Sequence, residues 1–102
     1  MTSQRIRDAR RDVDLLESGW TPPPEMLADA PTLEDWILAR HPAGDVCLVG
    51  RCTGHPRLPD GPTNTSPVVA LNPEEGWART VSRWYRLGRR LSPRPVGEGF
   101  RL

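Results

Sequence analysis

The sequence contains no lysine, and all fourteen of its basic residues are arginine. This absence excludes a catalytic or Schiff-base lysine. Arginine makes planar, bidentate contacts to phosphates and carboxylates, so the bias is consistent with anion recognition. A GC-rich genome produces the same bias, and we favour that explanation because lysine is missing throughout the chain.

Hydrophobic residues are also scarce. They make up 36% of the 102 residues, and aromatic residues make up 6%. No apolar run approaches the length of a membrane span, and the N-terminus lacks the apolar segment of a signal peptide. We therefore expect a cytoplasmic protein with one small domain and no membrane contact, whose exposed apolar surface is covered by a partner protein or a second copy of the chain.

Cysteine is limited to Cys47 and Cys52. In the strand predicted over residues 45–53 these two side chains point to opposite faces. They can therefore neither form a disulfide with each other nor join His41 and His55 around a zinc ion. The sequence also lacks a phosphate-binding loop and a dinucleotide fingerprint, so we expect no metal and no cofactor.

The charges are unevenly distributed along the chain. Residues 21–78 carry three arginines and eight acidic residues, whereas residues 79–102 carry seven arginines and one acidic residue. The basic segment predicts contact either with an external anion or with the acidic middle of the same chain.

An amphipathic helix is predicted over residues 3–18. Thr2 or Ser3 serves as its N-cap, and Gly19 follows its end. Its apolar residues recur at helical spacing and form one stripe, which consists of Ile6, Ala9, Val13 and Leu16. We expect this stripe to pack on the core.

Two further segments have features of helix starts. The three prolines at 22–24 predict an extended connector, followed by a short helical turn that begins at Pro24. A second helix is predicted over residues 32–40, with Thr32 as its cap. The residues that share one face of this helix are Leu33, Trp36 and Ile37.

Strands are predicted over residues 45–53 and 66–72, joined by a turn-rich loop. Residues 73–88 fit two structures. As a helix capped by Asn72, they would line one face with arginines, as in a helix laid on nucleic acid. As the second half of a hairpin with a turn over residues 72–76, they would form a strand. In that strand one face would be aromatic and basic, with Trp77, Arg79, Val81, Arg83 and Tyr85.

Three motifs in this region are GHPRLPDG, TSPVVALNP and GWARTVSRWYRLG. Together they resemble a group of small uncharacterised proteins from bacteria and their mobile elements, a domain of unknown function. The resemblance implies a short β-meander and so favours the hairpin. We predict an α+β fold, in which helices 3–18 and 32–40 pack on an antiparallel β-meander of residues 45–53, 66–72 and 76–87. The domain is expected to cover residues 1–88, and residues 89–102 are expected to form an irregular or disordered tail.

The loop between the first two strands carries groups used in nucleophilic catalysis. They are His55, Asp60, Thr65 and Ser66. Their spacing fits no known catalytic signature, and such side chains commonly hold turns by hydrogen bonds to the backbone. We therefore interpret them as structural and expect no enzymatic activity, while an uncharacterised enzyme is the last alternative.

The candidate binding residues follow the hairpin turn. They are Trp77, Arg79, Arg83, Trp84, Tyr85 and Arg86. These residue types dominate interface hot spots. Our first hypothesis is therefore a small binding or regulatory protein that acts through protein–protein contacts, such as an inhibitor or anti-defence factor of a mobile element. The alternative is a nucleic-acid-binding accessory protein, whose arginines contact phosphates while its rings stack on bases. A homodimer is compatible with either hypothesis.

Overall fold

The computed structural model describes residues 3–91. Its helices are α1 (Gln4–Glu17) and α2 (Pro24–Ala28). Its strands are β1 (Thr32–Arg40), β2 (Val46–Thr53), β3 (Gly61–Asn64), β4 (Val68–Asn72), β5 (Trp77–Thr80) and β6 (Trp84–Leu87). The predicted α+β class is confirmed, with most of the regular structure in the sheet. No helix within residues 3–91 is long and apolar enough to cross a membrane.

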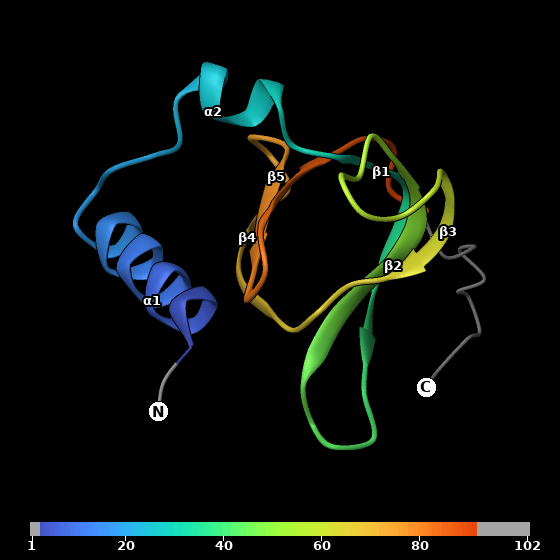
Figure 1. The fold of residues 1–102 in the computed structure, drawn as a ribbon, viewed down its shortest axis with the longest axis horizontal. Helices are drawn as coiled ribbons and strands as arrows, with labels where there is room; N and C mark the ends of the chain where they lie inside the picture. The colour runs from blue at the N-terminus through green and yellow to red at the C-terminus, as the bar shows by residue number, and fades with distance from the viewer. Residues whose placement is uncertain (1–2, 92–102) are drawn as a thin grey trace.

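The six strands form one sheet in the order β3-β2-β1-β6-β5-β4. Two antiparallel groups, β1 to β3 and β4 to β6, meet where β1 runs parallel to β6. The sheet curls so that β2 and β4 approach each other, while α1 lies outside the curl and α2 lies at one end of it (Figure 1). Thr65 lies in the connection between the two edge strands, β3 and β4, and ties it to β2. Its amide donates to the Leu48 carbonyl at 2.9 Å, and its hydroxyl accepts from the Leu48 amide at 3.0 Å.

The two helix starts nearest the N-terminus are as predicted. The Ser3 hydroxyl caps α1 by accepting from the Ile6 amide at 3.2 Å, and Gly19 adopts φ +102° after the helix ends. Glycine adopts this backbone conformation without the steric cost that other residues incur. The short helix α2 begins at Pro24, whose missing amide hydrogen costs nothing at that position.

The helix predicted over residues 32–40 is wrong, because this segment is the long strand β1. A β-bulge interrupts β1 between Glu34 and Ile37, where Asp35 adopts φ +51°. The extra residue places both Leu33 and Trp36 on the core side, although they are three positions apart. Apolar spacing of three and four residues, which predicted a helix, is here produced by the bulge.

The hairpin is confirmed, but the predicted meander is incomplete. Strand β3 lies within the segment predicted as loop, and a second turn separates β5 from β6, so residues 76–87 are not one strand. The Thr80 side chain builds that turn: its hydroxyl accepts from the amides of Ser82 at 3.1 Å and Arg83 at 3.2 Å. The Thr80 amide donates to the Arg83 carbonyl at 2.9 Å across the same turn.

The core fills the inside of the curl. It consists of Leu33, Trp36, Leu48, Cys52, Ala78 and Tyr85, with Val68, Leu71 and Leu87 packed against it. Trp36 is 1% exposed, and its indole nitrogen donates to the Gly88 carbonyl at 3.1 Å. The core therefore joins both halves of the sheet across the parallel pair.

The chain after β6 continues along β1. The Gly88 amide donates to the Leu33 carbonyl at 2.7 Å, and the Leu91 amide donates to the Trp36 carbonyl at 3.0 Å. Of the predicted tail over residues 89–102, the part from 92 onward lies outside the described residues.

Gly88→Ala is expected to destabilise the protein by about 1 kcal/mol. A Cβ at this position would meet the Glu34 carboxylate, which accepts from the Arg89 amide at 2.8 Å. Because the end of a glutamate side chain is flexible, the cost is the loss of that hydrogen bond. The measurement is urea unfolding of the wild type, each single variant and the double variant with Glu34→Ala. In the Glu34→Ala background, Gly88→Ala should leave the free energy of unfolding unchanged. An undiminished cost in the Glu34→Ala background would contradict this explanation.

Candidate functional site

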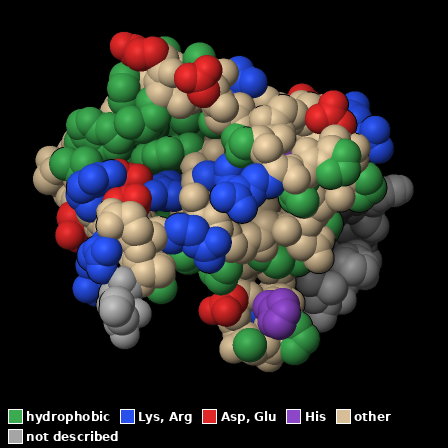
Figure 2. Space-filling view, in the orientation of Figure 1, with side chains coloured by type: hydrophobic (Ala, Val, Ile, Leu, Met, Phe, Trp, Pro, Cys, Tyr) green, Lys and Arg blue, Asp and Glu red, His purple; other side chains and the backbone are tan. Residues whose placement is uncertain are grey.

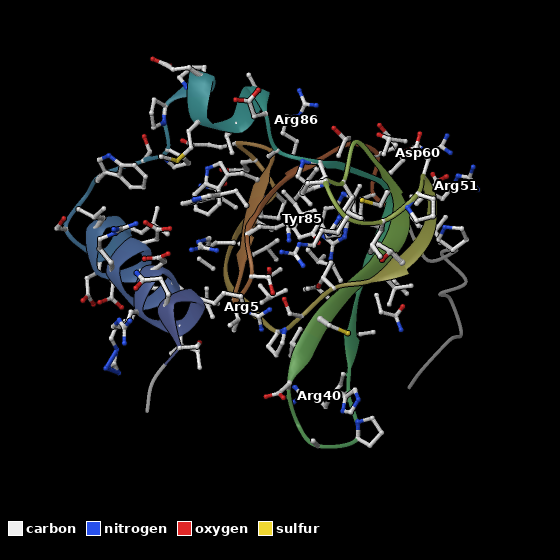
Figure 3. The ribbon with its side chains drawn as sticks, viewed as in Figure 1. Arg5, Arg40, Arg51, Asp60, Tyr85 and Arg86 are labelled. Carbon is white, nitrogen blue, oxygen red and sulfur yellow. The ribbon has the colours of Figure 1, made fainter. Side chains whose placement is uncertain are left out.

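The candidate binding residues divide between two faces of the sheet. Pairing of Trp77 with Arg86 and of Arg79 with Trp84 places these four side chains on the outer face of β5 and β6. Tyr85 pairs with Ala78 and lies on the inner face. The single aromatic and basic face predicted from alternation is therefore wrong, because the turn at Thr80 restarts the register. Figure 3 shows Tyr85 within the curl of the sheet and Arg86 above it, toward α2.

The outer face is covered by the N-terminal part of the chain. Arg79 Nε donates to Asp12 Oδ2 of α1 at 2.8 Å, and the two residues are 4% and 6% exposed. The guanidinium also donates to the Thr80 carbonyl at 2.9 Å and lies 5.6 Å from the centre of the Trp84 ring. The positive charge of Arg79 is therefore used inside the fold.

Three tryptophans form a second cluster on the same outer face. The Trp84 ring centre lies 5.4 Å from that of Trp77 in an edge-on arrangement, and 6.0 Å from that of Trp20. Trp77 is buried, Trp84 is half-buried and Arg86 is exposed. Figure 2 shows a broad hydrophobic area beside the arginines in the middle of this view.

Most polar side chains of the β2–β3 loop and of the segment after it are engaged within the fold. Asp60 accepts from the Gly54 amide at 3.1 Å, and the Thr65 hydroxyl donates to the Ser66 carbonyl at 2.8 Å. The Ser66 hydroxyl donates to the Ser82 hydroxyl at 2.8 Å. The described residues contain no group of three or more histidine, cysteine or acidic side chains that suits a metal ion.

His55 holds its own loop. Its Nδ1 accepts from the amides of Arg57 at 3.0 Å and Leu58 at 3.2 Å, so the neutral ring carries its proton on Nε2. Burial lowers the pKa of His55, and the nearby charges of Arg83 and Arg57 lower it further. The imidazole is therefore neutral near pH 7 and lies 6.4 Å, centre to centre, from the Tyr85 ring.

Acidification is expected to weaken the fold through His55. The unfolded chain takes up the proton at the ordinary pKa of about 6.5, whereas the folded chain takes it up only at lower pH. Stability is therefore lost as the pH falls below about 6.5 and levels off below the folded pKa. The measurement is the free energy of unfolding between pH 5 and 7.

His55→Asn is the matched variant, because the Asn Oδ1 occupies the place of Nδ1 and accepts the same two amides without titrating. It should remove this part of the pH dependence while keeping the stability measured at pH 7. His55→Ala should lose about 1 kcal/mol at pH 7. An Asn variant that retains the full pH dependence would contradict the assignment.

Arg83 differs from the other arginines of this region. Its Nε is buried without a hydrogen-bond partner, and within residues 3–91 its guanidinium makes no ion pair. It lines a hollow of about 170 Å³ between α2, the segment leading into β1, the β2–β3 loop and the start of β6. The other lining residues are Met26, Asp29, Ala30, Pro31, Pro56 and Trp84.

Two ionisable groups close to Arg83, Cys52 and Tyr85, are neutral near pH 7. Burial raises the pKa of the Cys52 thiol, with a further rise from Asp60 and a partial opposing effect of Arg83. Burial also raises the pKa of Tyr85, with the same opposing effect of Arg83. The guanidinium therefore has neutral neighbours on its inner side and one acid, Asp29, on the wall of the hollow.

The sequence predicts Arg79, Arg83 and Arg86 as members of one binding surface. In the structure, Arg79 is paired with Asp12, Arg83 makes no ion pair within the described residues, and Arg86 is exposed. A signal for the pairing of Arg79 was present: Asp12 lies three residues after Ala9 and so interrupts the apolar stripe of α1. The contributions of Met26 and Pro56 to the hollow had no sequence signal.

No curated protein and no solved structure matches the chain. The match found is to Family of unknown function (DUF6634), and it covers residues 8–94. This range includes the whole sheet, the Asp12–Arg79 pair and the hollow at Arg83. The chain belongs to this family of unknown function.

Proposed function

We propose that the protein is a small non-enzymatic binding protein that acts through contact with another protein, and that this contact is centred on Arg83. The observation that supports the proposal most strongly is the half-buried guanidinium without a partner. Its Nε–H is buried, but its terminal N–H groups are accessible and make no hydrogen bond within the described residues. An acceptor on a partner can therefore reach these terminal groups and form charge-assisted hydrogen bonds with them.

The surroundings of Arg83 have the composition of an interface centre. Met26 is 41% exposed and Trp84 is half-buried, and both line the hollow beside the arginine together with Pro56 of the β2–β3 loop. Arginine and tryptophan provide most of the binding energy in typical interfaces, where they are surrounded by apolar contacts that exclude water. The loop, α2 and β6 belong to distant parts of the chain, so the fold presents them as one surface.

The nucleic-acid alternative receives less support. It depends on rings and arginines that reach bases and phosphates. Trp77 and Arg79 are buried, and Arg79 is already paired with Asp12. We therefore place protein recognition first.

Two parts of this proposal rest on sequence features alone. The motif resemblance supports an origin in bacteria or their mobile elements, where an inhibitor or anti-defence factor is one form of such a binding protein. The second part is a cytoplasmic location, which we propose for such a binding protein.

Arg83→Ala is expected to abolish capture of a specific protein from native lysate without lowering stability. The measurement is affinity capture with the tagged full chain, followed by thermal unfolding of each variant. Arg51→Ala is the matched control, because Arg51 is an exposed arginine of β2 that does not line the hollow. Equal capture by wild type and Arg83→Ala would contradict the proposal. Retention on DNA with a steep salt dependence would favour the alternative.

A further inference from the structure

The hollow at Arg83 has one charged donor group and apolar walls. Pro31, Pro56 and the Trp84 ring line it together with Met26. The four terminal N–H donors of the planar guanidinium make no hydrogen bond within the described residues, whereas its Nε–H is buried. This geometry suits a planar two-oxygen acceptor that is attached to a short aliphatic stem.

The size of the hollow limits its occupant. Its volume of about 170 Å³ is below the range of about 300–1,000 Å³ that is typical of pockets for drug-sized ligands. A nucleotide is therefore too large to be enclosed, whereas a single side chain fits.

The charges favour a monoanion. Arg83 supplies one positive charge, and His55, Cys52 and Tyr85 are neutral near pH 7. Asp29 lines the same hollow but makes no ion pair with Arg83 in the part of the chain that the structure describes. Asp29 repels any anion in the hollow, but it repels a dianionic phosphate more strongly than a carboxylate. One guanidinium also neutralises a carboxylate fully and a dianionic phosphate only by half.

We propose that this hollow binds the side-chain carboxylate of an acidic residue, presented by a protein partner, with the carboxylate on Arg83 and its methylene stem between Pro31, Pro56 and Trp84. This inference rests on the proposed function and adds the chemistry of the partner. It makes the surface selective for segments that carry an accessible glutamate or aspartate.

The test is an NMR titration of the full chain with small-molecule probes. The readout is the ¹⁵N chemical shift of the Arg83 Nε–H group. The probe is N-acetylglutamate α-amide, whose only charge is the side-chain carboxylate. N-acetylglutamine α-amide is the neutral isostere, and inorganic phosphate is the competing oxyanion, all at constant ionic strength. We expect a saturable shift with the glutamate probe, no saturable shift with the glutamine probe, and weaker binding of phosphate.

Three variants sharpen the result. Arg83→Gln should weaken binding of the glutamate probe at least tenfold, which corresponds to the loss of a charge-assisted hydrogen bond; for this variant the backbone amides around the hollow report binding. Asp29→Asn should strengthen binding because a like charge is removed. Arg51→Gln should leave binding unchanged, because this exposed arginine does not line the hollow. A backbone spectrum of each variant establishes that it is folded.

Equal shifts with the glutamate and glutamine probes, tighter binding of phosphate, or unchanged binding by folded Arg83→Gln would each overturn the inference. Failure of the proposed function gives a different pattern. If the glutamate probe binds at Arg83 but Arg83→Ala captures the same proteins as wild type, the carboxylate site stands and protein recognition through it falls. If capture depends on Arg83 but the glutamate probe does not bind, protein recognition through Arg83 stands and the carboxylate site falls.

Discussion

Asp12→Ala is expected to lower the free energy of unfolding by about 3–5 kcal/mol. Asp12 Oδ2 accepts from Arg79 Nε at 2.8 Å, and both side chains are buried between α1 and the sheet. Removal of the carboxylate leaves a buried guanidinium without its counter-charge, and α1 loses its main polar attachment to β5. Arg11 lies 3.8 Å from the same carboxylate, but it is itself a cation and so cannot supply the lost counter-charge to Arg79. The measurement is urea unfolding followed by tryptophan fluorescence.

Asp8→Ala is the matched control for this prediction. Asp8 lies one helical turn earlier and pairs with Arg11 at 3.9 Å on the surface, so its removal should cost less than about 1 kcal/mol. The double variant Asp12→Leu with Arg79→Met should recover most of the stability, because neither charge is then left unpaired. If Asp12→Ala proves as mild as Asp8→Ala, the ion pair does not hold α1 on the sheet.

Trp36→Ala is expected to have an effect of similar size, about 3–5 kcal/mol. Trp36 is 1% exposed at the centre of the core, and the Arg90 guanidinium lies 4.9 Å from its ring centre. Its truncation opens a cavity in the core and removes the hydrogen bond from its indole nitrogen to the Gly88 carbonyl. Thermal and urea unfolding measure the loss of stability. Trp36→Phe should lose roughly half as much free energy of unfolding as Trp36→Ala, because it retains an aromatic ring.

Gly50→Ala tests the same packing from the opposite strand. A Cβ at Gly50 would lie 2.9 Å from the Glu34 carbonyl oxygen and 3.2 Å from the Trp36 Cα and Cβ. These contacts are with backbone and the base of a side chain, so they cannot be relieved by a rotamer change. The expected cost is about 1–3 kcal/mol. A neutral Gly50→Ala would mean that the bulge of β1 relaxes freely and that Trp36 is not fixed by it.

The elements that were predicted correctly are those with signals in their own sequence. Ser3 and Gly19 delimit α1, Pro24 begins α2, and the turn before Gly76 is fixed locally by the Asn72 side chain, which accepts from the Glu75 amide at 3.0 Å. In each case the hydrogen-bond partner or the backbone conformation lies within a few residues. Short-range rules are sufficient for such features.

The error at β1 has a different physical origin. Leu33 and Trp36 face the core with helical spacing because a bulge shifts the register between them. The bulge is stabilised by partners that follow much later, since Arg89 donates to Asp35 from a position 54 residues further on. No local rule anticipates that contact, so the apolar spacing by itself predicts a helix.

The candidate site was predicted by residue type but not by arrangement. Among three similar arginines, the burial of Arg79 is decided by Asp12, which precedes it by 67 residues, and the isolation of Arg83 is decided by the Thr80 turn. Composition identifies arginine and tryptophan as candidates for binding. Only the fold determines which guanidinium is left without a partner.

The parallel pairing of β1 with β6 also determines when the domain can form during synthesis on the ribosome. Each antiparallel group of strands is built from near neighbours in the chain, but β1 receives its second neighbour only when residues 84–91 have been added. Asp12 likewise has no counter-charge until Arg79 emerges. A nascent chain that has exposed α1 and the first three strands therefore carries an uncovered core face and an unpaired acid. We infer that folding is completed in one late step, when β6 enters the sheet and both halves close together.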